Sequence, residues 1–140
     1  MIKKLIYVRK TNFVREGGRK FKYTAYTAVS NKIDKIGISK SKSSDFTNSI
    51  LKSFKKSKKK IFKFKIFNKT INTSKIFKVG KTITKFFPEK SKGLIIGGNA
   101  RKIISMTGIK NIICKIYGSK NKINVIKATI KLLKYLKCFI

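Results

Sequence analysis

The sequence predicts an α+β fold in two parts, in which three strands and a helix are followed by a second sheet with two more helices. Three observations predict it. Apolar and polar residues alternate in several runs, apolar residues recur at helical spacing in others, and Gly or Pro separates most of these segments. The 140 residues, 41% of them hydrophobic, suffice for one ordinary domain or two small ones that share a boundary.

The first two expected strands flank a basic turn. Residues 5–13 are rich in β-branched and aromatic types, and the following VREGGRKF places Gly17-Gly18 between two arginines. Residues 21–30 then alternate, and residues 35–40 form a third short strand. One face of the second strand carries Phe21, Tyr23, Ala25, Thr27 and Val29, and the other carries Lys22, Thr24, Tyr26 and Ala28. Together these segments predict a three-stranded antiparallel sheet.

A helix is expected next. Ser44 or Asp45 can cap it, and Phe46, Ile50 and Phe54 recur at every fourth position, which predicts an apolar stripe over one face of the sheet. The helix ends in KKSKKK, residues 55–60. This run is either a solvated cationic end that complements the helix dipole or a direct RNA contact, and the sequence leaves both open.

A second unit is expected to begin at residue 61, which divides the chain into domains 1–60 and 61–140. Residues 61–67, IFKFKIF, alternate strictly and are predicted to start a second sheet. Residues 76–87 continue that sheet, with Gly80 as a turn or bulge, until Pro88 ends it.

The rest of the second unit reads as helix, strand, loop and helix. Gly97-Gly98 precede a short helix that Gly108 terminates, and residues 109–117 form a strand. Apolar positions of the short helix are Ala100, Ile103, Ile104 and Met106, and those of the last helix, residues 123–136, are Ile123, Ile126, Ile130, Leu133 and Leu136. For the three glycines, tight packing is favoured over ligand binding.

Charge restricts the function more than any single residue does. Lys and Arg number 37 against 4 for Asp and Glu, for a formal net charge of +33. The arginines are Arg9, Arg15, Arg19 and Arg101, so 37 − 4 leaves 33 lysines. So much like charge favours a polyanionic partner, and nucleic acid is the first candidate. Part of the lysine excess is expected from an AT-rich genome.

The same composition argues against an enzyme and against a metal site. The chain has no His, and its four acids, Glu16, Asp34, Asp45 and Glu89, form no predicted carboxylate pair. Cys114 and Cys138 cannot supply the four ligands of a structural zinc site, so both are interpreted as small hydrophobic side chains in a reducing compartment. No catalytic residue, cofactor or metal is predicted.

No membrane partner is predicted either. The longest uncharged runs fall well short of the roughly 20 apolar residues that span a bilayer, and residues 5–8 are too short for the core of a secretory signal. The protein is therefore expected to be made and used in one compartment. The β-type alternation also argues against a membrane-active amphipathic protein.

Two segments resemble a known family. VREGGRKFKYTA, residues 14–25, and GLIIGGNARKIISMTGIKNIICKIYGSKNKINVIKATIKLL, residues 93–133, are similar to signature regions of the bacterial-type ribosomal protein S-five family. The resemblance covers about residues 5–136. It implies an N-terminal double-stranded-RNA-binding-like β-β-β-α domain followed by a C-terminal α/β two-layer sandwich domain.

The resemblance also implies a role. Such a protein is a structural constituent of the small ribosomal subunit that binds rRNA, stabilises the body near the head, and supports mRNA entry and translational accuracy. Its implied partners are small-subunit rRNA, ribosomal proteins S-four and S-eight, and mRNA near the entry channel. The expected location is the ribosome, either in the cytoplasm of a bacterium, with an endosymbiont favoured, or in an organelle with its own genome. The alternative is a general cationic nucleic-acid-binding protein or RNA chaperone.

The predicted RNA contacts lie in two regions. In the loop 14–19, glycines let the backbone approach a phosphate while arginines donate charge-assisted hydrogen bonds. An ordinary hairpin turn would have the same residues, and the resemblance favours the contact. Asn121 and Asn124 are either cap and turn residues or RNA contacts. The predicted RNA-binding residues are Arg15, Gly17, Gly18, Arg19, Lys20, Lys42, Arg101, Lys115, Ser119, Lys120, Asn121 and Lys127.

Three departures from the family pattern bear on these predictions. Glu16 occupies a loop position that is often basic or neutral in relatives. Ser39 and Ser41 replace small flexible positions, so a stiffer third strand is expected. Lys122 stands where relatives commonly have the Pro that begins the last helix.

Overall fold

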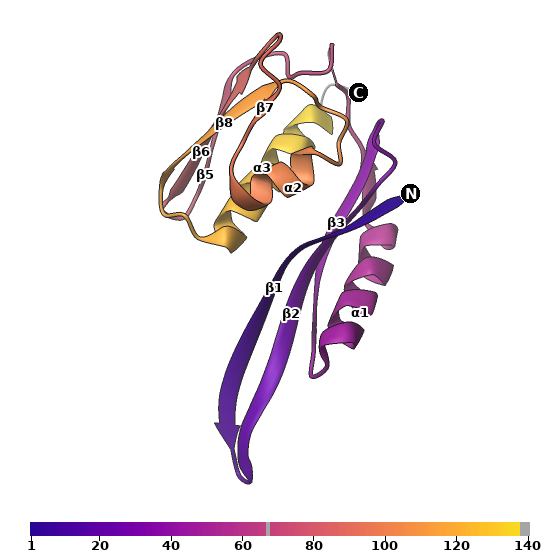
Figure 1. Ribbon diagram of the computed structural model, residues 1–140, viewed down its shortest axis with the longest axis vertical. Helices are drawn as coiled ribbons and strands as arrows, with labels where there is room; N and C mark the ends of the chain where they lie inside the picture. The colour runs from indigo at the N-terminus through magenta and orange to yellow at the C-terminus, as the bar shows by residue number, and fades with distance from the viewer. Residues whose placement is uncertain (67, 138–140) are drawn as a thin grey trace.

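A computed structural model describes residues 1–66 and 68–137, and it confirms the predicted α+β class. Two four-stranded sheets stack with three helices in the order α1, first sheet, α2 with α3, second sheet (Figure 1). The elements are β1 Ile2–Arg15, β2 Gly18–Ser30, β3 Lys35–Ser43, α1 Phe46–Lys59, β4 Ile61–Lys63, β5 Lys75–Val79, β6 Thr82–Pro88, β7 Leu94–Ile95, α2 Gly98–Ile104, β8 Ile112–Gly118 and α3 Lys122–Lys137.

The first sheet is antiparallel in the order β1-β2-β3-β4. The predicted start of a second sheet at residue 61 is therefore wrong, because β4 pairs with β3 through Ile36 opposite Phe62. Only Lys60 separates α1 from β4, so the chain returns directly to the open edge of β3. Phe67, the last residue of the predicted strand, lies outside the described residues.

Helix α1 covers the sheet with serines instead of the predicted apolar stripe. Ser49, Ser53 and Ser57 are its buried residues, whereas the Phe46 side chain is 47% exposed. The physical reason is that α1 lies very close to β3. A Cβ built on Gly37 of β3 would overlap the Ser57 carbonyl oxygen. Only small side chains fit there. Asp45 is at the N-cap position, but its side chain makes no capping bond and accepts from Asn48 Nδ2 at 2.8 Å instead.

Hydroxyl groups in this interface satisfy one another. Thr27 Oγ1 lies 2.8 Å from Ser53 Oγ and 3.0 Å from Ser57 Oγ. Ser39 Oγ donates to the Ser53 carbonyl at 2.8 Å and lies 3.0 Å from Ser57 Oγ. Buried polar groups must be paired to be tolerated, and here the pairing also ties the helix to two strands.

Replacing Ser53 with Ala is expected to lower the free energy of unfolding by about 1 to 2 kcal/mol. The change removes the hydroxyl that bonds Thr27 and the Ser39 carbonyl inside the interface. Urea unfolding followed by circular dichroism measures the loss. The exposed loop residue Ser91 supplies the control, since Ser91→Ala removes a solvated hydroxyl. An equal effect of the two substitutions would count against the buried network.

The second sheet has the order β5-β6-β8-β7, with β7 parallel to β8 and the other pairs antiparallel. Gly80 forms the turn between β5 and β6 with φ +59°, as predicted. Helices α2 and α3 pack against each other and against one face of this sheet (Figure 1). Ile126, Leu133 and Leu136 of the predicted α3 stripe are fully buried, while Ile123 and Ile130 pack against the core at its edge.

One continuous core joins the two sheets. Ile6, Tyr26 and Ile36 of the first sheet belong to the same buried cluster as Ile103 and Ile104 of α2. The first sheet is therefore packed on both sides, with α1 against β2 and β3 on one side and α2 against β1 on the other. Polar contacts support this packing, since Ser30 Oγ donates to the Met106 carbonyl at 2.6 Å and Lys102 Nζ to the Ile6 carbonyl at 3.0 Å.

Cys114 lies in this core, and burial raises the pKa of its thiol to about 12 from an ordinary value of 9.0. The folded state therefore holds the proton more tightly than the unfolded state does. The resulting stabilisation is fully present below about pH 9 and is lost as pH rises toward 12. Cys138, the other predicted hydrophobic cysteine, lies outside the described residues.

In a Cys138→Ser background, the Cys114 thiol is expected to react with a disulfide reagent at pH 8 roughly 100-fold more slowly in the folded than in the unfolded chain. The thiolate is the reactive form, and burial suppresses it. Absorbance of the released thiol, followed with and without urea, measures both rates. Equal rates would show that the side chain is accessible in the folded protein.

Candidate RNA-binding surface

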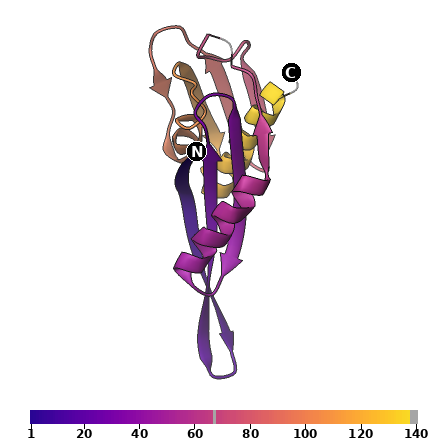
Figure 2. The same cartoon turned by 90° about the vertical axis from the view of Figure 1, so that its right-hand side faces the viewer.

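The β1–β2 hairpin projects beyond the rest of the molecule (Figure 2). The two strands pair from Ile2 opposite Ser30 to Arg15 opposite Gly18, but β3 pairs with β2 only from Tyr23 onward. Residues 18–22 of β2 consequently have an open edge. Gly17 and Gly18 at the tip have φ +84° and +114°, and no atom lies within 4 Å of a Cβ built on either. The tip is thus shaped for close approach by a partner.

Strand register gathers the predicted cations of the first sheet on one face. Residues opposite each other, and residues two apart on one strand, share a face. Arg15 lies opposite Gly18, Lys22 opposite Thr11, and Lys42 opposite Thr24. This basic face consists of Arg9, Arg15, Lys20, Lys22 and Lys42. Arg19, opposite Val14, belongs to the other face at the tip. All of these side chains except the half-buried Lys22 are exposed.

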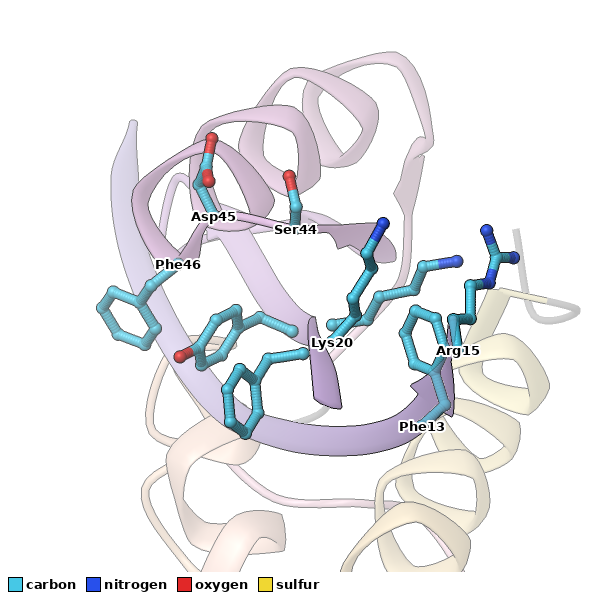
Figure 3. Close-up of a pocket in the computed structure, with 9 residues that line it drawn as sticks. Phe13, Arg15, Lys20, Ser44, Asp45 and Phe46 are labelled. Atoms are coloured by element: carbon cyan, nitrogen blue, oxygen red, sulfur yellow. The ribbon is translucent and has the colours of Figure 1, made fainter. Parts of the chain in front are cut away.

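An open groove of about 600 Å³ runs between the hairpin and the first turn of α1 (Figure 3). Its aromatic lining residues are Phe13, Phe21, Tyr23 and Phe46, and its cationic ones are Arg15, Lys20 and Lys22. Phe13 and Arg15 lie at one end of the groove and Phe46 at the other, with Lys20 between them (Figure 3). We call this feature the hairpin groove.

Cations stand over the aromatic rings of the hairpin. Lys10 Nζ is 4.0 Å from the centre of the Phe21 ring, and Lys22 Nζ is 4.7 Å from that of Phe13. The Tyr23 and Phe46 rings meet edge to face with centroids 5.8 Å apart, which fixes the start of α1 against β2. The hairpin therefore presents interleaved rings and positive charges.

A second candidate region is the loop between β8 and α3. Lys120 and Lys122 line a pocket of about 340 Å³ together with Gly97 and Gly98. The Ser119 carbonyl accepts from Thr82 Oγ1 at 2.7 Å, and Ser119 Oγ accepts from the Asn121 amide at 3.3 Å. These bonds hold the loop in place with the Lys120 side chain exposed.

The predicted packing role of two glycines is wrong. No atom lies within 4 Å of a Cβ built on Gly97 or Gly98, so neither permits a close helix–sheet contact. Gly98 is required by its φ of +56° instead. Gly108 does have the predicted role, because its φ is +82° and a Cβ there would overlap the Lys32 carbonyl oxygen.

The remaining predicted residues are spread over the second unit. Asn121 Oδ1 accepts from the Ile123 amide at 3.1 Å and so caps α3, which supports the capping interpretation. Lys115 is exposed on β8, and Arg101 and Lys127 are exposed on α2 and α3. Arg101, Lys115 and Lys127 line neither the hairpin groove nor the Gly97–Lys120 pocket. The structure thus brings Lys42 together with the predicted residues of the hairpin, residues 15–20. It leaves Arg101, Lys115 and Lys127 outside both sites.

Sequence reasoning missed the aromatic half of the hairpin groove. Phe21 and Tyr23 were expected on a sheet face, and Phe46 was expected in the core. The available signal was the RKFKY run beside the tip, residues 19–23, since basic residues interleaved with aromatic ones are typical of nucleic-acid surfaces. Lys10 and Lys122 were missed as well.

The acidic residues do not form a catalytic or metal centre. Asp34 Oδ1 accepts from Asn31 Nδ2 at 2.6 Å, and Glu89 pairs with Lys92 at 3.9 Å. Within residues 1–66 and 68–137, no group of three His, Cys, Asp or Glu side chains is placed to hold a metal ion. No helix in the same described residues is long and apolar enough to cross a bilayer. These features define the class: a basic α+β protein whose large excess of cations favours a polyanionic partner.

Comparison with known proteins gives the family. Residues 1–65 match the N-terminal domain of ribosomal protein S5, and residues 78–139 match its C-terminal domain. The small ribosomal subunit protein uS5 of Buchnera aphidicola subsp. Cinara cedri (strain Cc) is 36% identical over 135 residues, which cover 96% of this chain and 82% of that protein. The uS5 protein of Wigglesworthia glossinidia brevipalpis is 33% identical, with 96% and 81% covered. The chain belongs to the ribosomal protein S5 family and is not an enzyme.

Proposed function

We propose that this protein is a structural component of the small ribosomal subunit that binds rRNA mainly through the β1–β2 hairpin. The observation that carries the proposal is the projecting hairpin, whose tip glycines are uncrowded and whose flanking residues Arg15, Arg19 and Lys20 are exposed. A projecting basic hairpin of this kind can enter irregular RNA and neutralise phosphates from within it.

The chain divides at about residue 60 into two units, and each unit supplies part of the RNA-binding surface. The first unit supplies the hairpin and its basic face, while the second supplies Lys115, Ser119, Lys120 and Asn121 for further contacts with phosphate or a neighbouring protein. Shape and phosphate contacts of this kind position a protein on RNA without reading its sequence.

The finer role is part of the same proposal, and family membership supports it. Within the subunit, the protein stabilises the body near the head, contacts ribosomal proteins S-four and S-eight, and supports mRNA entry and translational accuracy. The relatives named above come from endosymbiotic bacteria. The proposed location is therefore the ribosome of a bacterium with a reduced genome, ahead of an organelle.

Replacing Arg15 and Arg19 together with Ala is expected to weaken binding to small-subunit rRNA by about 10- to 100-fold, because each arginine donates charge-assisted bonds to phosphate. The slope of log affinity against log salt is expected to fall by about 1 for each lost contact. Filter binding over a salt series, with small-subunit rRNA and a random-sequence RNA of equal length, measures both quantities.

The matched control replaces two exposed lysines of the second unit, Lys90 and Lys110, with Ala. This control also removes two positive charges, but from positions outside the hairpin. The hairpin variant is expected to lose preference for rRNA over the random RNA, and the control to keep it. Equal losses in the two variants would favour the alternative of a general cationic nucleic-acid-binding protein.

A further inference from the structure

The hairpin groove combines exposed rings with cations that the protein does not neutralise. Phe21 and Phe46 are 41% and 47% exposed, high values for rings of this size. Among the described residues, no carboxylate lies within 4.0 Å of Arg15, Lys20 or Lys22. The one acid in the groove, Asp45, accepts a hydrogen bond from Asn48. A ligand for this groove therefore needs both flat apolar surface and negative charge.

Phe21 offers ring surface to the groove. Its partly exposed side chain lines the groove, whereas Lys10, whose Nζ lies 4.0 Å from the centre of that ring, does not. Part of the Phe21 ring is therefore accessible to a flat ligand. At the other end of the groove, Phe46 stands edge to face with Tyr23, so its ring is held in place before any ligand binds. Rings fixed in advance lose little conformational entropy on binding.

We propose that the hairpin groove binds unpaired nucleotides of RNA, with bases stacked on Phe21 and Phe46 and the phosphates facing Arg15, Lys20 and Lys22. The inference deepens the proposed function and depends on it. Stacking on aromatic side chains is tolerant of base identity, because every base has a flat face. Bases inside a duplex are already stacked and cannot reach these rings, so the groove requires a bulge, a loop or a single-stranded segment.

The open edge of β2 makes room for such a strand. Residues 18–22 have β1 on one side and no strand on the other, and the groove follows this edge toward Ser44–Phe46. An extended RNA strand can lie along it while keeping its phosphates near the lysines. An acidic peptide would match the charge, but it would leave the exposed rings without stacking partners.

The test compares two probes of equal charge with the full-length chain. One is an eight-nucleotide oligoadenylate, and the other is the corresponding abasic ribose-phosphate oligomer. Fluorescence anisotropy at rising salt measures their affinities for the wild-type chain and for the Phe21→Leu/Phe46→Leu variant. Tyr117→Leu is the matched control, because it removes an exposed ring with a lysine 5.0 Å above it on the second sheet. Circular dichroism confirms that each variant is folded.

The wild-type chain is expected to bind the base-containing oligomer roughly 5- to 100-fold more tightly than the abasic one. The groove variant is expected to lose this difference while keeping its affinity for the abasic oligomer, and the control is expected to retain the difference. Equal binding of both oligomers to the wild-type chain would overturn the inference and leave the proposed function intact. The inference would also be overturned if an octaglutamate peptide bound more tightly than both oligomers and competed with them. Equal losses in the Arg15/Arg19 variant and the Lys90/Lys110 control of the preceding experiment would instead count against the proposed function.

Discussion

Replacing Gly108 with Ala is expected to lower the free energy of unfolding by about 4 kcal/mol, close to the whole stability of a marginal domain. Two effects add. A side chain at φ +82° is strained, and the new Cβ would overlap the Lys32 carbonyl oxygen of the loop after β2. That carbonyl cannot retreat freely, because the Lys32 amide donates to Ser30 Oγ at 3.0 Å and Ser30 Oγ donates to the Met106 carbonyl.

A matched variant separates the two effects. Gly93 has φ +74°, and no atom lies within 4 Å of a Cβ built on it. Gly93→Ala is therefore expected to lose only the conformational part, about 1 to 2 kcal/mol. Urea unfolding of the full-length chain, followed by circular dichroism, compares the two variants. If both lose the same amount, the contact between the Lys32 loop and the end of α2 does not hold the two sheets together.

Replacing Gly37 with Ala is expected to lower the free energy of unfolding by about 3 kcal/mol. The Cβ would overlap the backbone carbonyl of Ser57 and come within 2.9 Å of Ile61 Cγ1. Since the first obstacle is backbone, the change must move α1 away from β3. That movement also stretches the hydroxyl bonds among Thr27, Ser53 and Ser57.

Gly97→Ala is the control for this substitution. Gly97 has φ −93°, outside the left-handed region, and no atom lies within 4 Å of its built Cβ. Thermal unfolding is expected to show a lower midpoint for the Gly37 variant and a smaller loss, of at most about 1 kcal/mol, for the Gly97 variant, because Ala is a poorer N-cap residue than Gly. A Gly37 variant as stable as the control would mean that α1 does not rest on the sheet as closely as the serine interface requires.

The sequence predicted most of the fold because local patterns and the final packing agree. Alternation in residues 21–30 predicted β2, which buries residues 25–30, and the apolar stripe predicted α3, which buries Ile126, Leu133 and Leu136. Gly80 was found because a positive φ is needed at a tight turn, which is a local requirement. Gly108 was predicted to terminate the short helix, but α2 ends at Ile104 with Ser105 as its C-cap, and Gly108 has its positive φ in the turn that follows. The division of the chain at residue 60 stays a prediction, since β4 follows that point and still pairs with β3.

The wrong predictions have one physical origin. Each depended on what the residue packs against in the folded protein, which local sequence patterns do not reveal. Phe46, Ile50 and Phe54 had the better hydrophobic pattern, but the small residues of β2 and β3 bring α1 so close that serines fit instead. Gly97 and Gly98 resembled packing glycines, yet no neighbour approaches them. The hairpin groove was missed because its rings come from β1, β2 and α1, which are joined only by the fold.

The most direct test of the central claim is sedimentation of source-cell lysate on a sucrose gradient at moderate and then high salt, with this protein followed by mass spectrometry. We expect the protein to remain with small ribosomal subunits at a salt concentration that strips loosely bound cationic proteins, because specific contacts add to the bulk electrostatic attraction. Spreading over DNA and free RNA, with uniform loss as salt rises, would contradict the claim.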